Sequence, residues 1–260
     1  MEKVNPYNSN NKLITINDIV NIMETLNISN FKVNDILLYQ TSFIHKSYCK
    51  ELYEDTDFNN IDDSLPLQES SYETMEFLGD SILGSIVSSY LYERFYKIYN
   101  QDEGFLTYLK NRIVCGEMNA YLSSKLGFNK HLIISKHIED KCGRNNKKIL
   151  NNVFESFLGA IFLDNDYDIT KNILLNIIEK HIDFTDIIIK NNNYKDQIYK
   201  YLQHNFKENP RYSDTVCNDD IYRCDLIFQD KIISHGDGNS KKEAQQDASK
   251  NALVHYNVLN

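Results

Sequence analysis

The 260-residue sequence predicts an all-α domain followed by a small α+β domain with the order α-β-β-β-α. Two observations support this. Up to about Asp183, apolar residues recur at spacings of three and four, as on helices, and no strand-like alternation is convincing. After the run Asn191–Asn193, short segments rich in Tyr, Val, Ile and Phe precede a last helical segment. We expect an N-terminal extension with a helix at 1–30, the helical domain at 31–185, a linker at 186–194 and the small domain at 195–258.

Helical spacing divides the first domain into segments. Gly127 stands where it can end one of them at a C-cap, and Tyr72–Tyr99 carries the strongest apolar stripe. Two polar and charged stretches, Tyr48–Ser71 and Ser135–Asn146, are expected to be loops. The expected helices are Ile16–Leu26, Asn34–Ser47, Tyr72–Tyr99, Gly104–Leu126, Lys147–Leu163 and Ile173–Ile182.

The second domain has a different pattern, in which strand-like segments lie between two helical ones. Ser240 is expected to cap a last helix that runs to about Val254, after a turn at Gly236–Asn239. Alanines at every fourth position of this helix, from Ala244 to Ala252, make a narrow seam that suits packing on a sheet. The other expected elements are a helix at Asp196–Phe206 and strands at Arg211–Val216, Tyr222–Phe228 and Lys231–His235.

Composition excludes several classes. No apolar run approaches the roughly 18 residues that span a bilayer, so we expect no membrane partner. Met1–Asn11 is polar and lacks a secretory signal, which predicts an intracellular protein, in the cytoplasm or the nucleus. The five cysteines form no CxxC pair and are expected to be reduced thiols. The seven histidines show no metal-ligand spacing, and His45 is expected to be a helix-packing residue.

The net charge of −9 argues against simple electrostatic binding of nucleic acid. From Tyr194 onward there are 9 Lys and Arg against 10 Asp and Glu, a net charge of −1, so the first 193 residues carry −8. Bound metal cations could offset part of that acidic excess. Any affinity for RNA must come from local basic patches.

Three acids share one helix face. Glu73, Glu76 and Asp80 stand at i, i+3 and i+7, about one turn apart. Like charges at this spacing destabilise a bare helix, so a cation is expected beside them. The alternative is a solvated acidic stripe, and the flanking apolar residues count against it because they would bury much of the helix. Gly79 between the acids predicts close approach of another backbone.

A second helix adds oxygen donors. Lys147–Leu163 is apolar almost all round, with Asn152 and Glu155 at i and i+3 on one face. If the two helices pack, a cage of oxygen ligands can form. Such hard ligands suit Mg²⁺, with Mn²⁺ as a substitute, and a metal there can generate hydroxide and stabilise a leaving oxygen in phosphodiester hydrolysis. The candidate ligands are Glu76, Asp80, Asn152 and Glu155.

These segments resemble the ribonuclease III family. Glu73–Leu83 is similar to the family signature, Lys148–Leu163 to its second segment, and Thr41–Tyr48 to its "LTHxSY" stretch. The resemblance covers about residues 30–260. It implies a homodimer joined through the signature helix, which cleaves double-stranded RNA to 5′-phosphate products with two-nucleotide 3′ overhangs. The residues it implies at the catalytic site are Glu73, Glu76, Asp80, Lys148, Asn152 and Glu155, with Lys148 beside the scissile phosphate.

Position 152 departs from the family, which has Asp there. The Asn152 amide oxygen can coordinate Mg²⁺ but brings no charge, and its NH₂ group could instead face and repel the ion. The sequence therefore allows two functions. One is a Mg²⁺-dependent endonuclease of double-stranded RNA, and the other is a non-cleaving binder of double-stranded RNA.

The last helix begins with Ser240, Lys241 and Lys242, whose free N–H groups and charges suit phosphate. A plain surface helix is the alternative. The stretch resembles the "GxGxSKKxAxxxAA" end of double-stranded-RNA-binding domains, which read A-form shape largely without sequence preference. That resemblance implies further RNA contacts from Gln197 and Lys200, although Lys200 replaces the usual Glu. The family's histidine-bearing loop is here the short, acidic Cys217–Asp220, which predicts weaker minor-groove contacts.

Overall fold

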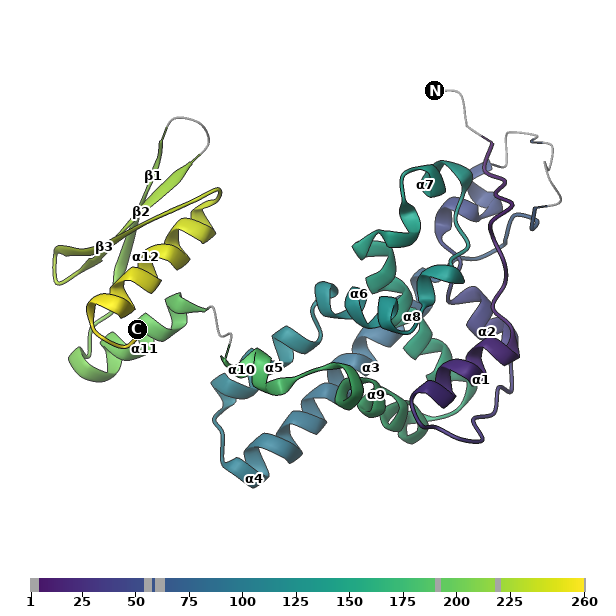
Figure 1. Ribbon diagram of the computed structural model, residues 1–260, viewed down its shortest axis with the longest axis horizontal. Coiled ribbons are helices and arrows are strands. Elements are labelled where there is room, and N and C mark those ends of the chain that lie inside the picture. The colour runs from purple at the N-terminus through teal and green to yellow at the C-terminus, as the bar shows by residue number, and fades with distance from the viewer. Residues whose placement is uncertain (1–4, 54–57, 59–63, 190–192, 218–220, 260) are drawn as a thin grey trace. The chain divides into compact units, whose positions relative to one another are not determined.

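The computed structural model describes residues 5–53, 58, 64–189, 193–217 and 221–259 (Figure 1). The chain divides into two compact units, Met1–Phe184 and Thr185–Asn260. The first unit is helical, and the second has the order helix, three strands, helix, so the predicted fold class is confirmed. None of the helices in the described ranges combines the length and the apolar composition that a membrane-spanning helix needs.

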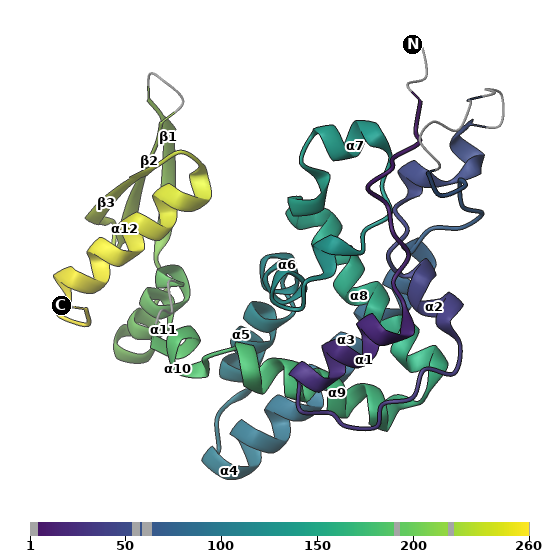
Figure 2. The ribbon, with the colours of Figure 1, turned by 45° about the vertical axis from the view of Figure 1, so that its right-hand side comes forward.

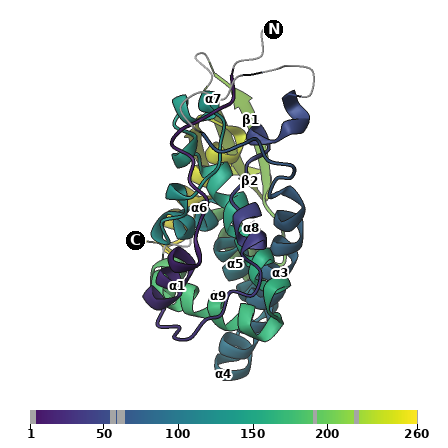
Figure 3. The ribbon, with the colours of Figure 1, turned by 90° about the vertical axis from the view of Figure 1, so that its right-hand side faces the viewer.

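In the first unit, α8 (Lys147–Asp164) is buried along most of its length. It runs through the middle of the unit and packs against α3 (Glu73–Leu91), α6 (Gly116–Lys125) and α9 (Tyr167–His181) (Figure 2, Figure 3). A π-helical turn, Tyr92–Tyr96, continues α3 into α4. The remaining helices of this unit are α1 (Ile16–Thr25), α2 (Ile36–Thr41), α4 (Lys97–Tyr99), α5 (Glu103–Ile113) and α7 (Lys136–Asp140), with short 3-10 turns at Lys46–Tyr48, Lys50–Tyr53, Phe128–Lys130 and Gly143–Asn145. α10 (Phe184–Ile189) starts at the last residue of the first unit and continues into the second.

Two predicted helices are interrupted. The helix expected to reach Ser47 ends at Thr41, because the chain then extends and pairs with another segment. The His45 N–H donates to the Ile133 carbonyl and the Ile133 N–H donates to the Phe43 carbonyl, both at 2.9 Å. The stretch Gly104–Leu126 forms two helices, since Cys115 has an extended backbone. Gly127 follows α6 in the left-handed region, with φ of 75°, as predicted.

Two segments are more helical than predicted. Ser135–Asn146 was expected to be a loop because of its charges, but it contains α7 and a 3-10 turn. Its Glu139 and Arg144 form a largely buried ion pair of 2.8 Å instead of facing water. α9 begins six residues before the expected Ile173, because the Asp166 side chain caps it by accepting from Ile169 N–H. Of the other predicted loop, residues 54–57 and 59–63 lie outside the described residues.

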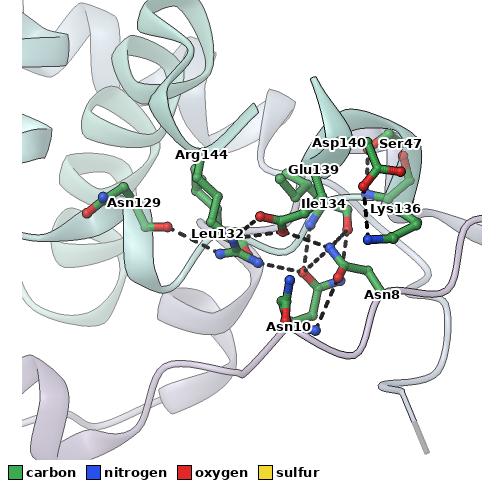
Figure 4. A network of polar contacts seen from close by, with 12 residues as sticks. Asn8, Asn10, Ser47, Asn129, Leu132, Ile134, Lys136, Glu139, Asp140 and Arg144 are labelled. Carbon is green, nitrogen blue, oxygen red and sulfur yellow. Dashed lines mark hydrogen bonds and ion pairs between the residues drawn. The ribbon is translucent and has the colours of Figure 1, made fainter. Parts of the chain in front are cut away.

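The N-terminal segment lies against residues 132–136, which lead into α7 (Figure 4). The buried Asn8 and Asn11 both donate to the Ile134 carbonyl, at 3.1 and 2.9 Å. The Asn11 amide oxygen accepts from Ile134 N–H and from the Arg144 guanidinium, both at 3.2 Å. Because Ile14, Ile19 and Met23 are buried as well, the segment predicted as an extension is packed into the first unit.

The second unit is an antiparallel sheet in the order β1-β2-β3 with α12 packed along it and α11 beside α12 (Figure 1). β3 continues through the predicted turn to Gly238, pairing Gly236 with Cys224. A Cβ atom on Gly236 would stand 2.0 Å from the Ala248 nitrogen, so glycine is needed where the strand meets the buried alanine seam. The elements are α11 (Tyr194–Phe206), β1 (Arg211–Val216), β2 (Tyr222–Phe228), β3 (Lys231–Gly238) and α12 (Lys241–His255).

The predicted linker, 186–194, overlaps two helices. α10 covers its first residues, and Asn193 caps α11 by accepting from Asp196 N–H. Asn191 and Asn192, part of the run that marked the linker, lie outside the described residues.

Candidate active site

The site is built where α3 and α8 touch through their backbones. A Cβ atom on Gly79 would stand 1.8 Å from the Glu155 carbonyl oxygen, and one on Gly159 would stand 2.5 Å from the Met75 carbonyl oxygen. Only glycines allow this crossing, which confirms the close approach predicted at Gly79. The crossing brings the face of α3 that carries Glu76 and Asp80 next to the Asn152–Glu155 face of α8.

A cleft of about 720 Å³ lies beside this crossing. It brings together all six residues that the sequence predicted for the catalytic site, from three turns of α3 and the first half of α8. Their catalytic roles stay predictions. The cleft is lined by Glu73, Glu76, Asp80, Lys148, Asn152 and Glu155, and also by His45, Lys46, Tyr72, Phe77, Ile138, Asn146 and Ile149.

The carboxylates in the cleft influence one another. Glu155 is only 7% exposed, and its burial, together with the charges of Asp80 and Glu76, raises its pKa to about 7. Burial and the charge of Glu73 also raise the pKa of Glu76, and the charge of Lys148 opposes that shift. Negative charge is therefore crowded and partly desolvated here, which a bound cation would relieve.

Basic side chains stand at the rim. Lys46 forms an ion pair of 2.9 Å with Glu73, and Lys148 is exposed in the first turn of α8. The Asn146 side chain starts that helix by accepting from Lys148 N–H at 2.9 Å and from Ile149 N–H at 3.3 Å. This cap fixes the point at which Lys148 enters the cleft.

His45 and Tyr72 were not predicted to lie in the site. His45 lies just before the 3-10 turn Lys46–Tyr48, outside the helix in which the sequence placed it. Its Nδ1 lies 2.8 Å from Ser47 Oγ, and its ring centre is 5.8 Å from that of the buried Tyr72. The Tyr72 side chain forms a hydrogen bond with Asn152, while burial and the charge of Glu76 raise the pKa of its phenol. Two signals could have found these residues: His45 stands in the "LTHxSY" stretch, and Tyr72 comes one turn before Glu76.

The donor set suits a hard divalent cation. The four predicted ligands, Glu76, Asp80, Asn152 and Glu155, all line the same cleft, and oxygen donors of this kind are those that Mg²⁺ prefers. Among residues 5–53, 58, 64–189, 193–217 and 221–259, no three Asp, Glu, His or Cys side chains already stand close enough together to hold a metal. The repulsion that raises the pKa values of Glu76 and Glu155 is a physical reason for the carboxylates to stand apart without an ion.

Comparison with known proteins agrees with this arrangement. Residues 35–182 match the family model described as ribonuclease-III-like. The chain belongs to the ribonuclease III family. Residues 194–256 match the double-stranded RNA binding motif, so this family member carries both units that the sequence predicted.

Individual relatives show how far the likeness extends. Ribonuclease 3 of Protochlamydia amoebophila is 31% identical over 86% of this chain and 87% of its own length. The probable ribonuclease 3 of Acanthamoeba polyphaga mimivirus is 29% identical over 96% of this chain, and the chain spans 47% of that relative. The nuclease domain of ribonuclease III from Campylobacter jejuni aligns with a TM-score of 0.49 at 26% identity, covering 63% of this chain and 98% of that domain.

In this ribonuclease III family member, the predicted RNA-binding residues lie on two helices of the second unit. Ser240 caps α12 by accepting from Glu243 N–H at 3.2 Å, and Lys241 and Lys242 are exposed in its first turn. Lys200 on α11 is exposed and pairs with Asp196 at 3.0 Å, and Gln197 is half-buried on the same helix. Of the loop predicted to weaken the minor-groove contact, Asn218–Asp220 lies outside the described residues.

Proposed function

We propose that the chain is a divalent-metal-dependent endonuclease of double-stranded RNA. The observation that carries the proposal is the single cleft that unites Glu76, Asp80, Asn152 and Glu155 with Lys148. Mg²⁺, or Mn²⁺ in its place, would be held by the three carboxylates and the amide oxygen of Asn152. Family membership and the RNA-binding unit support duplex RNA as the substrate.

The residues of the cleft would have different roles in hydrolysis. When bound, a divalent ion supplies an activated water and stabilises the charge that builds on the leaving oxygen. Lys148, exposed at the start of α8 and lining the cleft, would contact the scissile phosphate. Glu155, with a pKa of about 7, carries a proton in part of the metal-free molecules near neutral pH, and a cation would displace that proton.

We also propose that two copies act together through α3. Phe77 supports this, because it is a large apolar side chain, 80% exposed, next to the acidic face of the helix. In such a homodimer each copy would cut one strand. The products would carry 5′-phosphates and two-nucleotide 3′ overhangs, as the family resemblance implies.

Incubation of the full chain with a long duplex RNA and Mg²⁺ or Mn²⁺ tests the proposal directly. We expect short duplex fragments on a native gel, with 5′-phosphate ends. A specific observation favours the second candidate, a non-cleaving binder: Asn152 replaces a charged ligand. Duplex binding without cleavage in either ion would decide for that candidate.

Asn152→Asp should raise the cleavage rate in Mg²⁺ by at least about tenfold, or roughly 1.4 kcal/mol of barrier. Position 152 lies one helical turn before Glu155, so a carboxylate there adds a full charge to the same ion. In a chelator, the added repulsion should lower the stability of the free protein. Initial rates over a Mg²⁺ titration measure the effect, with Asn145→Asp, outside the cleft, as a charge-matched control.

An Asn152→Asp variant no faster than the parent at any Mg²⁺ concentration contradicts this prediction. If the parent then cleaves well, the amide is a competent ligand. If both proteins are inactive, the binder is favoured.

Lys241→Ala combined with Lys242→Ala should weaken duplex binding by a similar factor for unrelated sequences. Both lysines are exposed at the positive end of α12, so they suit phosphate and not base edges. Each lost contact should reduce the slope of log affinity against log salt by an amount of the order of 0.9, the value for B-form DNA. Fluorescence anisotropy over a salt series measures it.

Arg211→Ala with Lys231→Ala is the matched control, because both residues lie at the opposite end of the sheet. An unchanged slope in the α12 variant would show that its lysines do not contact the duplex.

A further inference from the structure

Two asparagines donate to the Glu155 carboxylate, and one of them also donates to a third asparagine. Asn119 comes from α6, whereas Asn151 and Asn152 come from α8. The Asn119 Nδ2 donates to Glu155 Oε1 at 3.0 Å, and the Asn151 Nδ2 donates to Oε2 at 3.3 Å. Each oxygen of the carboxylate therefore has an amide donor of its own.

The amides are also bonded in series. The Asn119 Nδ2 donates to Asn151 Oδ1 at 3.0 Å, and the Asn151 Nδ2 donates to Asn152 Oδ1 at 3.2 Å. Rotating the amide of Asn119 or of Asn151 by half a turn would put an oxygen against the carboxylate, so the network fixes both orientations. We call Asn119 and Asn151 the amide relay.

Burying the Asn119 side chain at its position is energetically unfavourable. It is fully buried on α6, where Ala120, Leu122 and Ser123 are buried as well. Its own Oδ1 has no hydrogen-bond partner among the described residues. Buried polar atoms are usually paired, and an apolar side chain would avoid the unpaired oxygen. The Asn119 amide, however, donates hydrogen bonds to Asn151 and to Glu155, which an apolar side chain could not do.

We propose that the amide relay positions the Glu155 carboxylate and the Asn152 amide oxygen for a divalent cation. This inference rests on the proposed function and adds two residues that act through the ligands and do not touch the ion. Each Glu155 oxygen accepts one amide N–H and keeps acceptor capacity for the cleft. Held in this way, the carboxylate does not turn away from Glu76 and Asp80 when their charges repel it.

The relay also distinguishes the two ends of the Asn152 amide. The side-chain N–H of Asn151 donates to the amide oxygen of Asn152, and the NH₂ group of Asn152 could not accept that hydrogen bond. Tyr72 also forms a hydrogen bond with the Asn152 side chain. An oxygen held by one neighbour still has a free lone pair for a cation. The relay thus opposes the rotation that would present the NH₂ group of Asn152 to the ion.

Mn²⁺ binding to the full chain without RNA tests the relay apart from catalysis. Isothermal titration calorimetry should give a Kd about tenfold or more higher for Asn151→Ala and for Asn119→Leu, the loss typical when a partner of a metal ligand is removed. Ser156→Ala is the control, because Ser156 is a buried neighbour of Glu155 whose hydroxyl has no partner among the described residues. Its Kd should equal that of the parent.

Cleavage assays supply a second readout. In Asn151→Ala, half-saturation should shift to higher Mg²⁺, and the rate at saturating Mg²⁺ should stay within about threefold of the parent, because the relay acts on ligand geometry. A purely structural role would lower stability and leave the metal dependence unchanged. Asn151 is only half-buried, so its variant decides the test even where Asn119→Leu folds poorly.

The outcomes separate this inference from the proposed function. A folded Asn151→Ala protein with the parent's Kd for Mn²⁺ overturns the relay, and so does a parent that binds no Mn²⁺. If the parent also cleaves RNA, the proposed function survives that loss. Weakened Mn²⁺ binding in Asn151→Ala, with no RNA cleavage by the parent, supports the relay and overturns the endonuclease.

Discussion

Glu155→Gln should lower cleavage of duplex RNA by about a thousandfold or more, equivalent to at least roughly 4 kcal/mol of barrier. Asn152 already contributes a neutral oxygen, so a second amide would leave only Glu76 and Asp80 with charge for the ion. Metal affinity depends on that charge count. Single-turnover cleavage at several Mg²⁺ concentrations measures the loss, and Glu117→Gln on the exposed face of α6 is the control.

The same variant should keep the fold, which thermal unfolding in a chelator can check. Folding raises the pKa of Glu155 from 4.5 to about 7, so the folded protein binds this proton more tightly than the unfolded chain does. The parent should therefore lose stability relative to Glu155→Gln as the pH rises from about 5 to about 8. Equal cleavage rates for the parent and Glu155→Gln would show that Glu155 is not a catalytic residue.

Gly79→Ala should destabilise the first unit by about 3 kcal/mol or more, at the upper end of the cost of overpacking a core. The new methyl group would stand 1.8 Å from the Glu155 carbonyl oxygen, so α3 and α8 must move apart. For a unit of this size the melting temperature should fall by about 6–12 °C. Differential scanning calorimetry measures the shift.

Gly84→Ala on the same helix is the matched control. A Cβ atom there meets only the end of the Lys110 side chain, at 4.0 Å. Alanine favours a helix over glycine by up to about 1 kcal/mol, so this variant should be as stable as the parent or slightly more. Equal melting temperatures for the two glycine variants would contradict the backbone contact between α3 and α8.

Local spacing was sufficient to predict the elements that carry the motifs. α3, α8 and α12 have their apolar residues, glycines and caps within one stretch of sequence, and the predicted fold class and family followed from them. The site was predicted in the same way, because Glu76 with Asp80 and Asn152 with Glu155 each share a helix face. The crossing that unites the two pairs was signalled by Gly79 alone.

What the sequence did not reveal depends on contacts between distant segments. His45 reaches the cleft because its backbone pairs with Ile133, and no local pattern encodes that pairing. α7 forms in a charged stretch because Arg144 neutralises Glu139. Nothing in the sequence pointed to Asn119. Its proposed role depends on a hydrogen bond to Glu155, which lies on another helix.

The N-terminal segment has a consequence for how this unit can be exchanged between relatives. The family match begins at residue 35, yet Asn8 and Asn11 hold Ile134, and Asn11 also holds Arg144. A chimera joined at residue 35, where the family match begins, would separate Arg144 from one of its acceptors and uncover the apolar surface beneath α1. The range that matches the family model is therefore shorter than the compact unit, which includes the N-terminal segment. Substitutions at Asn11 and Arg144 should be tolerated together more readily than singly.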